Sequence, residues 1–230
     1  MCTLGPRVGF DKHLAAIGDS HLPALLPALE AVAQQHNWRI DAASKNGCHW
    51  TTSTQRMSAG SMRACQRWKV ALNQKLEAEP PYDAILVTHR AGAFLPDAAP
   101  GEDQPTTIVR GLLESWRTQT ARGTRIIAIR DNPTATRSTA ACVARHRLSA
   151  NDFCSLDRAQ ALGRFDAHPA ATSALPGNAL VDLSDVYCNA GYCPVVIGNV
   201  VVYRDDNHIT ATFSRTLAPR LGEELERILR

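Results

Sequence analysis

The sequence has no hydrophobic stretch of the roughly 18 apolar residues that a membrane-spanning helix needs. Its beginning also lacks the sustained apolar segment of a signal peptide. Taken alone, these two absences favour a cytoplasmic protein. Lys and Arg form no run interleaved with aromatic residues, and aromatics make up only 6% of the chain. We therefore expect no nucleic acid among its partners.

Signs of metal binding are also missing. No two cysteines have the C-x-x-C spacing of a zinc ribbon or a thioredoxin motif. Five histidines are scattered along the chain without the spacing of metal ligands, namely His13, His36, His49, His146 and His168. We therefore expect neither a metal nor a cofactor.

Size and patterning predict one α/β domain over residues 1–230. Hydrophobic residues make up 44% and charged residues 20% of the 230, which allows a sizeable core. Apolar runs predict five strands, at residues 13–19, 38–44, 82–89, 125–130 and 179–183. Helical spacing predicts helices at 21–36, 61–77, 106–121 and 209–229, the last with a kink at Pro219, and two short helices within 135–167. Gly198-Asn199 predicts a hairpin at 195–203. Alternating strands and helices predict a three-layer α/β/α fold with a mostly parallel five-stranded sheet.

The seven cysteines argue against the cytoplasm. Six fall into pairs of close neighbours in the sequence, which predicts the disulfides Cys48–Cys65, Cys142–Cys154 and Cys188–Cys193 and leaves Cys2 unpaired. Buried free thiols are the alternative. Three disulfides imply an oxidising compartment. The simplest explanation for the missing export signal is that the chain is the soluble part of a larger, membrane-anchored protein.

Two short motifs near opposite ends of the chain predict a catalytic serine. Gly18-Asp19-Ser20-His21 lies where the first strand meets the first helix, so Ser20 is presented at the carboxyl edge of the sheet. His21 is expected to begin that helix and to be structural. Asp205 and His208 precede the last helix, with the spacing that lets a carboxylate contact imidazole Nδ1. Each motif alone is equally typical of a helix cap. Together they favour catalysis.

These motifs resemble the SGNH/GDSL hydrolase superfamily over almost the whole chain. The strings GDSH, KNGC and YRDDNH, with the paired cysteines, are similar to the SGNH domain fused to membrane acyltransferases of family 3. Those proteins O-acetylate cell-envelope glycans. The resemblance implies a glycan acceptor and an acyl donor delivered by a transmembrane acyltransferase domain. It also implies an extracytoplasmic, membrane-tethered location, which would explain the missing signal peptide.

The resemblance also assigns roles to individual residues. It implies Ser20 as nucleophile, His208 as general base and Asp205 as its orienting partner. The backbone N–H groups of Ser20 and Gly47 would form the oxyanion hole, although Gly47 is equally a plain turn glycine. Typical members carry G-x-N-D after the third strand. The segment 87–92 of this chain has no Asn, which leaves the third donor open.

Three further residues are candidate substrate contacts because they end strands at the same edge, namely His89, Arg90 and Asp131. A solvated loop start is the alternative for the first two, and a turn-capping role for Asp131. The leading function is O-acyl transfer to an envelope glycan through a serine acyl-enzyme, with acetyl as the expected acyl group. An esterase or deacetylase would use the same triad with water as acceptor. A non-catalytic glycan-binding module is the third alternative, and an intact triad argues against it.

Overall fold

The computed structural model describes residues 1–93 and 95–230. Its central sheet has six strands in the order β1-β3-β2-β4-β5-β7. These are β1 (Cys2–Leu4), β2 (Lys12–Gly18), β3 (Trp38–Ser44), β4 (Ala84–Thr88), β5 (Arg125–Ile129) and β7 (Ala179–Val181). All neighbours pair in parallel except β1, which runs antiparallel to β3. The mostly parallel sheet predicted from the sequence is confirmed.

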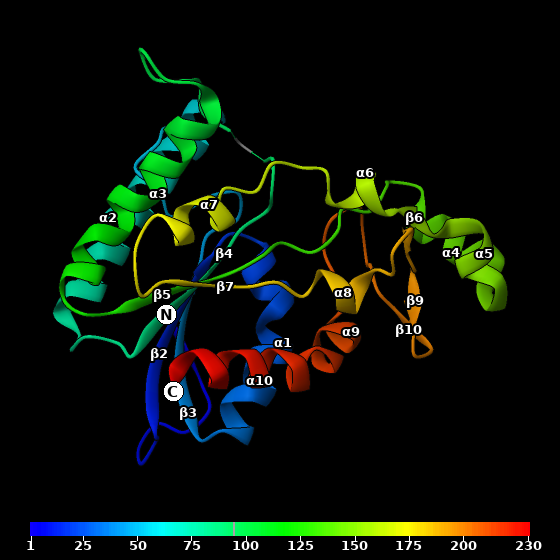
Figure 1. Cartoon of the computed structure of the whole chain (residues 1–230), viewed down its shortest axis with the longest axis horizontal. Coiled ribbons are helices and arrows are strands. Elements are labelled where there is room, and N and C mark those ends of the chain that lie inside the picture. The colour runs from blue at the N-terminus through cyan, green and yellow to red at the C-terminus, as the bar shows by residue number, and fades with distance from the viewer. Residues whose placement is uncertain (94) are drawn as a thin grey trace.

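Helices cover both faces of this sheet. On one face α1 (His21–Gln35) packs against α9 (Ala211–Thr216) and α10 (Ala218–Leu229). The other face carries α2 (Ala59–Ala78), α3 (Gln104–Ala121) and α7 (His168–Ser173), whose buried residues share one core with the sheet. Figure 1 shows α1 and α10 beneath the sheet and the α2 and α3 helices above it. The three-layer arrangement predicted from the sequence is therefore present.

Short elements form an extension beyond the end of the sheet (Figure 1). They are α4 (Thr139–His146), the 3₁₀ turn η1 (Arg147–Ser149), α5 (Ala150–Cys154), β6 (Leu156–Asp157), α6 (Arg158–Leu162), α8 (Ser184–Tyr187), β8 (Tyr192–Cys193), β9 (Val196–Ile197) and β10 (Val200–Val201). The predicted hairpin is β9–β10, and Gly198 and Asn199 both have positive φ at its turn. Both residue types tolerate that conformation, which the turn of a tight hairpin requires.

The structure forms all three predicted disulfides, and Cys2 is a free, exposed thiol. Cys48–Cys65 joins the loop after β3 to α2. The other two lie in the extension and link its short elements. In such segments a cross-link stabilises chiefly by restricting the unfolded chain. No helix within residues 1–93 and 95–230 is both long and apolar enough to cross a membrane.

Three details of the predicted fold differ from the structure. Residues 135–167 hold the three short helices α4, α5 and α6 and the 3₁₀ turn η1, where two short helices are predicted. The sheet has a sixth strand, β1, because three residues at an edge are too few to produce a recognisable alternation. The predicted helix at 209–229 is two helices, α9 and α10, which meet at Leu217. Pro219 lies in the first turn of α10, where the missing N–H costs no hydrogen bond.

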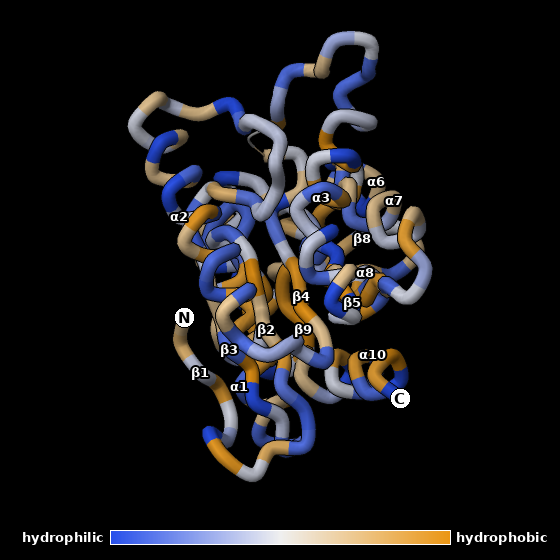
Figure 2. Tube along the Cα trace, turned by 90° about the vertical axis from the view of Figure 1, so that its left-hand side faces the viewer, coloured by the Kyte–Doolittle hydropathy of each residue, from blue (hydrophilic) through white to orange (hydrophobic). Residues whose placement is uncertain are grey.

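Strands β2 and β4 form the middle of the sheet and of the core. Leu14 to Ile17 are fully buried, as are the apolar residues of β4. Figure 2 shows the hydrophobic segments gathered on these central strands, with hydrophilic residues outside. The connections after β2 and β4 lead to helices on opposite faces of the sheet. A ligand site in such sheets lies at the carboxyl ends of the two strands where the chain diverges in this way.

Candidate active site

The turn after β2 is built by three residues with separate tasks. A Cβ on Gly18 would lie 2.4 Å from the Thr88 carbonyl oxygen, so only glycine fits beside β4. The Asp19 carboxylate accepts hydrogen bonds from the backbone N–H of His21 (2.9 Å) and of Arg90 (3.0 Å). It therefore ties the turn after β2 to the turn after β4. Ser20 follows at the N-terminus of α1.

Ser20, His208 and Asp205 are brought together as predicted. Ser20 Oγ lies 2.8 Å from His208 Nε2 across 188 residues of sequence. His208 Nδ1 lies 2.8 Å from one Asp205 carboxylate oxygen and 3.1 Å from the other. Asp205 Oδ1 also accepts the backbone N–H groups of Asn207 and His208, which fixes the loop. The line of contacts from carboxylate through imidazole to hydroxyl is the geometry of a serine nucleophile with its base.

Neither Ser20 nor Asp205 caps a helix with its side chain. The Ser20 side chain makes no capping hydrogen bond to α1, so its hydroxyl is directed to His208 instead. At the other end of the chain, Thr210 caps α9 through the Phe213 N–H. This leaves Asp205 free for His208. The geometry therefore favours the triad over the capping alternative.

Hydrogen bonds and neighbouring histidines favour the ionised form of two carboxyl groups at the site. Burial would raise the pKa of Asp205, but the backbone N–H groups of His208 and Asn207 and the His208 ring lower it to about 2. Burial likewise opposes ionisation of Asp19, yet His49 and His21 bring the pKa of that carboxyl to about 2. His49 Nε2 lies 3.4 Å from Asp19 Oδ2, and both side chains are buried. Both carboxylates are thus ionised at neutral pH.

His21, expected to begin the helix and to be structural, is the first residue of α1 and has both ring nitrogens paired. Its Nδ1 lies 2.5 Å from Asp131 Oδ1, and its Nε2 lies 3.0 Å from Asn207 Oδ1. Both partners accept, because the Asn207 amide nitrogen donates to Asp206. Burial lowers the pKa of His21, but the Asp131 charge and hydrogen bonds raise it overall. The ring thereby holds Asn207, and hence the loop between Asp205 and His208, against α1.

The three candidate substrate contacts occupy different surroundings. Asp131 is buried, and its carboxylate bonds to His21 and to the N–H groups of Ala91 and Asn132. These bonds leave a substrate-contact role for Asp131 without support. His89 is also buried, with its ring stacked on that of His49 and the His168 ring tilted against its other side. Arg90 is half-buried and gives its backbone N–H to Asp19.

Gly47 lies in the turn after β3, with a φ of +67° that favours glycine. The backbone N–H of Lys45 donates to the Gly18 carbonyl at 3.1 Å, which brings this turn beside the turn that carries Ser20. The Gln55 side chain and the Cys48–Cys65 disulfide hold the turn from the other side. Within the described residues the Gly47 N–H donates to no protein acceptor. This placement is compatible with the predicted oxyanion role.

The sequence analysis missed two sets of residues at this edge. The first is the His21–Asp131–Asn207 set, whose members are far apart in sequence. The second is a stack of imidazoles, in which the rings of His49 and His89 lie 4.0 Å apart and those of His89 and His168 lie 3.9 Å apart. Although His49 and His168 are scattered along the sequence, both lie beside His89 in the structure, because linear spacing does not reveal which strand ends meet.

Comparisons with known proteins indicate the family and the fold of the chain. A family model described as "SGNH domain (fused to AT3 domains)" matches residues 1–223. Compared by sequence with curated proteins, the chain has no match. The lipopolysaccharide acetyltransferase periplasmic domain of Salmonella ser. Paratyphi A aligns with a TM-score of 0.71 and 14% identity. That alignment covers 94% of this chain and 84% of the other.

Two further solved structures are similar in fold. The family two carbohydrate esterase from Clostridium thermocellum, in complex with cellohexaose, has a TM-score of 0.55 and 12% identity and covers 98% of this chain and 67% of the other. TesA has a TM-score of 0.50 and 16% identity and covers 95% and 98%. At these identities the likeness establishes the fold alone.

Proposed function

Because the chain belongs to the family of SGNH domains that are fused to AT3 domains, we propose that it transfers an acyl group to a hydroxyl of a cell-envelope glycan. Ser20 is the nucleophile in this proposal, and acetyl is the simplest group to transfer. One observation carries the proposal: Ser20 Oγ is 2.8 Å from a His208 ring whose other nitrogen is 2.8 Å from Asp205. A glycan-binding module has no need of that arrangement.

In the first step Ser20 Oγ attacks the carbonyl carbon of the acyl donor, and its proton passes to His208 Nε2. The bond between the acyl carbon and the donor's leaving group breaks, and the leaving group takes the proton from His208. Asp205 keeps Nδ1 protonated and stabilises the transient imidazolium. The N–H groups of Ser20 and Gly47 bind the oxyanion of the tetrahedral intermediate.

In the second step the acceptor takes the acyl group from Ser20. His208 Nε2 removes the proton of a sugar hydroxyl as the sugar oxygen attacks the acyl carbon. The ester bond to Ser20 Oγ breaks, and Oγ recovers the proton from His208. Water in place of the sugar gives an esterase by the same steps. A carbohydrate esterase is among the proteins of similar fold, so the esterase alternative is tested below.

The acyl donor arrives, in this proposal, from a transmembrane acyltransferase domain of the same protein. The family's fusion to AT3 domains supports a partner of this kind. The three disulfides support an oxidising compartment, so we place the chain, residues 1–230, outside the cytoplasm as a single tethered catalytic unit. No cofactor takes part in this chemistry.

The first test is hydrolysis of a small activated acetyl ester by the isolated chain. Slow turnover is expected, because the donor domain is absent and water replaces the glycan. Ser20→Ala should abolish it, and a serine-directed inhibitor should add its mass to the Ser20 peptide of the wild type alone. Thr210→Ser, at an unrelated hydroxyl that keeps its capping bond, is the matched control and should retain activity.

The second test separates transferase from esterase. Envelope oligosaccharides are added to the ester assay, and the products are examined by mass spectrometry. Acetylated oligosaccharide, formed by the wild type and absent with Ser20→Ala, supports the transferase. Fast hydrolysis without transfer to any glycan tested would favour the esterase. If the folded protein neither hydrolyses ester nor reacts with the inhibitor, a binding module should replace both.

A further inference from the structure

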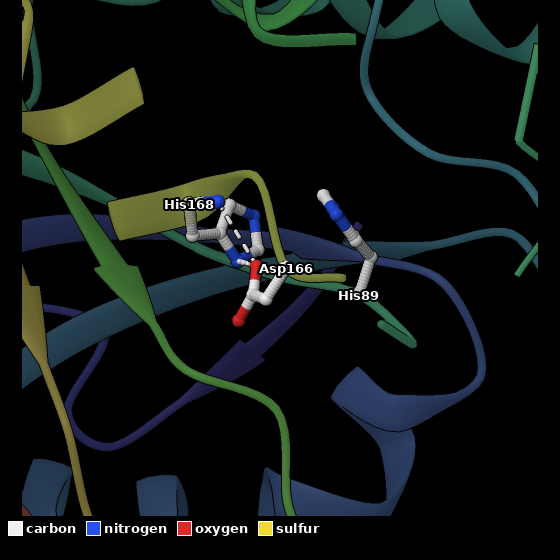
Figure 3. Close-up of side chains that lie close together, drawn as sticks. All are labelled: His89, Asp166 and His168. Atoms are coloured by element: carbon white, nitrogen blue, oxygen red, sulfur yellow. Dashed lines mark hydrogen bonds and ion pairs between the residues drawn. The ribbon is translucent and has the colours of Figure 1, made fainter. Parts of the chain in front are cut away.

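Three side chains that take no part in the proposed reaction meet behind the catalytic turns. His89 follows directly after β4, whereas Asp166 and His168 lie at the start of α7. One ligand atom from each lies within 4.8 Å of the others. Figure 3 shows the Asp166 carboxylate beside the His168 ring, with His89 to one side of the pair on a separate segment.

These side chains are buried with polar atoms that lack partners. His168 is 0% exposed and His89 is 4% exposed. Within the described part of the chain, both ring nitrogens of His168, Nδ1 of His89 and Oδ2 of Asp166 make no hydrogen bond. Buried polar atoms in native proteins almost always have a hydrogen-bond partner. Four unpaired atoms on three neighbouring side chains therefore point to a partner that binds all three. That partner must satisfy a carboxylate and imidazole nitrogens together.

The charges at the cluster favour a cation. Burial lowers the pKa of His89 well below its ordinary value. It also lowers the pKa of His168, although Asp166 partly opposes this. An imidazole nitrogen that makes no hydrogen bond is free to bind a ligand through its lone pair. Among the described residues no Lys or Arg forms an ion pair with Asp166. An anion would meet a carboxylate here, whereas a metal ion would meet three donors.

The spacing of two of these donors fits a metal. Asp166 Oδ1 and His168 Nδ1 are 3.4 Å apart, too far for a good hydrogen bond. Two ligands of a tetrahedral zinc ion, each about 2.0 Å from the metal, are separated by about 3.3 Å. With the three ligand atoms within 4.8 Å of one another, His89 has to move toward the pair by up to about 1.5 Å to complete such a site. Two imidazoles and one carboxylate are a known zinc ligand set that leaves a fourth position open.

We propose that His89, Asp166 and His168 bind one divalent cation of the zinc class. The ion joins the end of β4 to the start of α7. His89 is followed by Arg90, whose backbone N–H holds Asp19 in the turn that presents Ser20. The metal thereby positions this turn from behind and touches no reacting atom. The proposed metal site does not depend on whether the acyl group passes to a glycan or to water.

The experiment uses the 230-residue chain, purified without a histidine tag, with its disulfides intact. The protein is unfolded in guanidinium without reductant and refolded with Zn²⁺, because the buried ligands restrict entry to the folded chain. After removal of free metal, elemental analysis should find about one zinc per chain, and bound zinc should raise the melting temperature. Refolding with Co²⁺ should give the visible absorption of a tetrahedral site.

The ligand variants are Asp166→Asn and His168→Gln, which keep side-chain size. Each should lower zinc affinity at least tenfold and abolish the rise in melting temperature. Asp152→Asn and His146→Gln, at the exposed and half-exposed positions of α5 and α4, are the matched controls and should bind as the wild type does. Circular dichroism must show every protein folded. A folded wild type that retains no zinc, or zinc binding unchanged in both ligand variants, overturns the proposal and leaves a water or a neutral packed cluster instead.

Discussion

Two groups of buried histidine lie at the same edge of the sheet and have opposite electrostatics. His21 has a partner at each ring nitrogen, and the Asp131 carboxylate raises its pKa. His168 is at least as buried, has no hydrogen bond at either nitrogen within the described residues, and has a lowered pKa. The His21 ring links two carbonyl-type acceptors from separate loops. The His168 ring has no such partner among the described residues.

The difference teaches that burial alone does not decide the state of a histidine. Burial opposes protonation in both groups, and only the paired group has acceptors placed to overcome it. Asp131 approaches His21 from the end of β5, whereas Asp166 comes no closer than 3.4 Å to His168 Nδ1. The paired group also contacts the triad directly, because the rings of His21 and His208 lie 4.9 Å apart.

The largest effect is expected where a histidine depends on its carboxylate for catalysis. Asp205→Asn should reduce kcat for ester hydrolysis by about 10³–10⁴-fold, because the His208 tautomer is no longer fixed. Asp206→Asn is the matched control and should retain most activity, since the new amide oxygen can still accept from Asn207. The two rates are compared in the same assay. The reverse order would show that the orienting carboxylate is misassigned.

The next effect concerns the buried pair of His21 and Asp131. His21→Gln should lower the free energy of unfolding by about 3 kcal/mol, because it leaves the Asp131 carboxylate without its cation. It should also lower kcat about tenfold with KM unchanged, since Asn207 loses the bond that holds the triad loop (a bond of about 1–2 kcal/mol). Guanidinium unfolding with intact disulfides and steady-state kinetics check both. If kcat and stability match the His146→Gln control, the pair has no such role.

A smaller effect should appear in the pH dependence of stability. The folded pKa of His21 is raised above the ordinary value of 6.5 that holds in the unfolded chain. Its contribution is therefore complete below pH 6.5 and is lost as the pH rises through the folded pKa. The melting temperature should accordingly decline on the alkaline side, and Asp131→Asn should flatten that decline. An unchanged alkaline slope in Asp131→Asn would contradict a charged His21.

The smallest effect is expected outside both histidine groups, at the acceptor. A polar hollow of about 350 Å³ lies beyond β5, lined by Thr134, Asp157 and Gln160 among others. Thr134, in the wall of this hollow, is two residues from Asn132. The Asn132 side chain donates a hydrogen bond to the Asn207 carbonyl oxygen, in the loop that carries Asp205 and His208. If the glycan occupies this hollow, Gln160→Ala should raise the acceptor KM about threefold, the loss of one exposed hydrogen bond (about 0.6 kcal/mol). Hydrolysis of the small ester should not change.

The matched control for this variant is Gln66→Ala, an exposed glutamine on α2 across the molecule. It should leave the acceptor KM as in the wild type. Equal KM values for the two variants would place the acceptor elsewhere on the edge of the sheet.

The sequence by itself determined the local features of this protein. Asp205 and His208 are three residues apart in one loop, and Gly18-Asp19-Ser20 forms one turn, so their geometry follows from short-range chain constraints. The cysteine pairs are close neighbours for the same reason. Apolar runs for β2, β4 and β5 were readable because strands buried on both faces exclude polar residues. The short edge strand β1 had no such signature.

Only the tertiary structure decided which strand ends meet. His21 and Asp131 are separated by 110 residues and join because β2, β4 and β5 are neighbours in register. His89 and His168 meet because α7 packs beside the end of the same sheet. Whether a buried histidine finds a carboxylate at hydrogen-bond distance depends on such packing to within an ångström. Coulomb and desolvation energies change steeply over that distance, and no spacing along the chain encodes it.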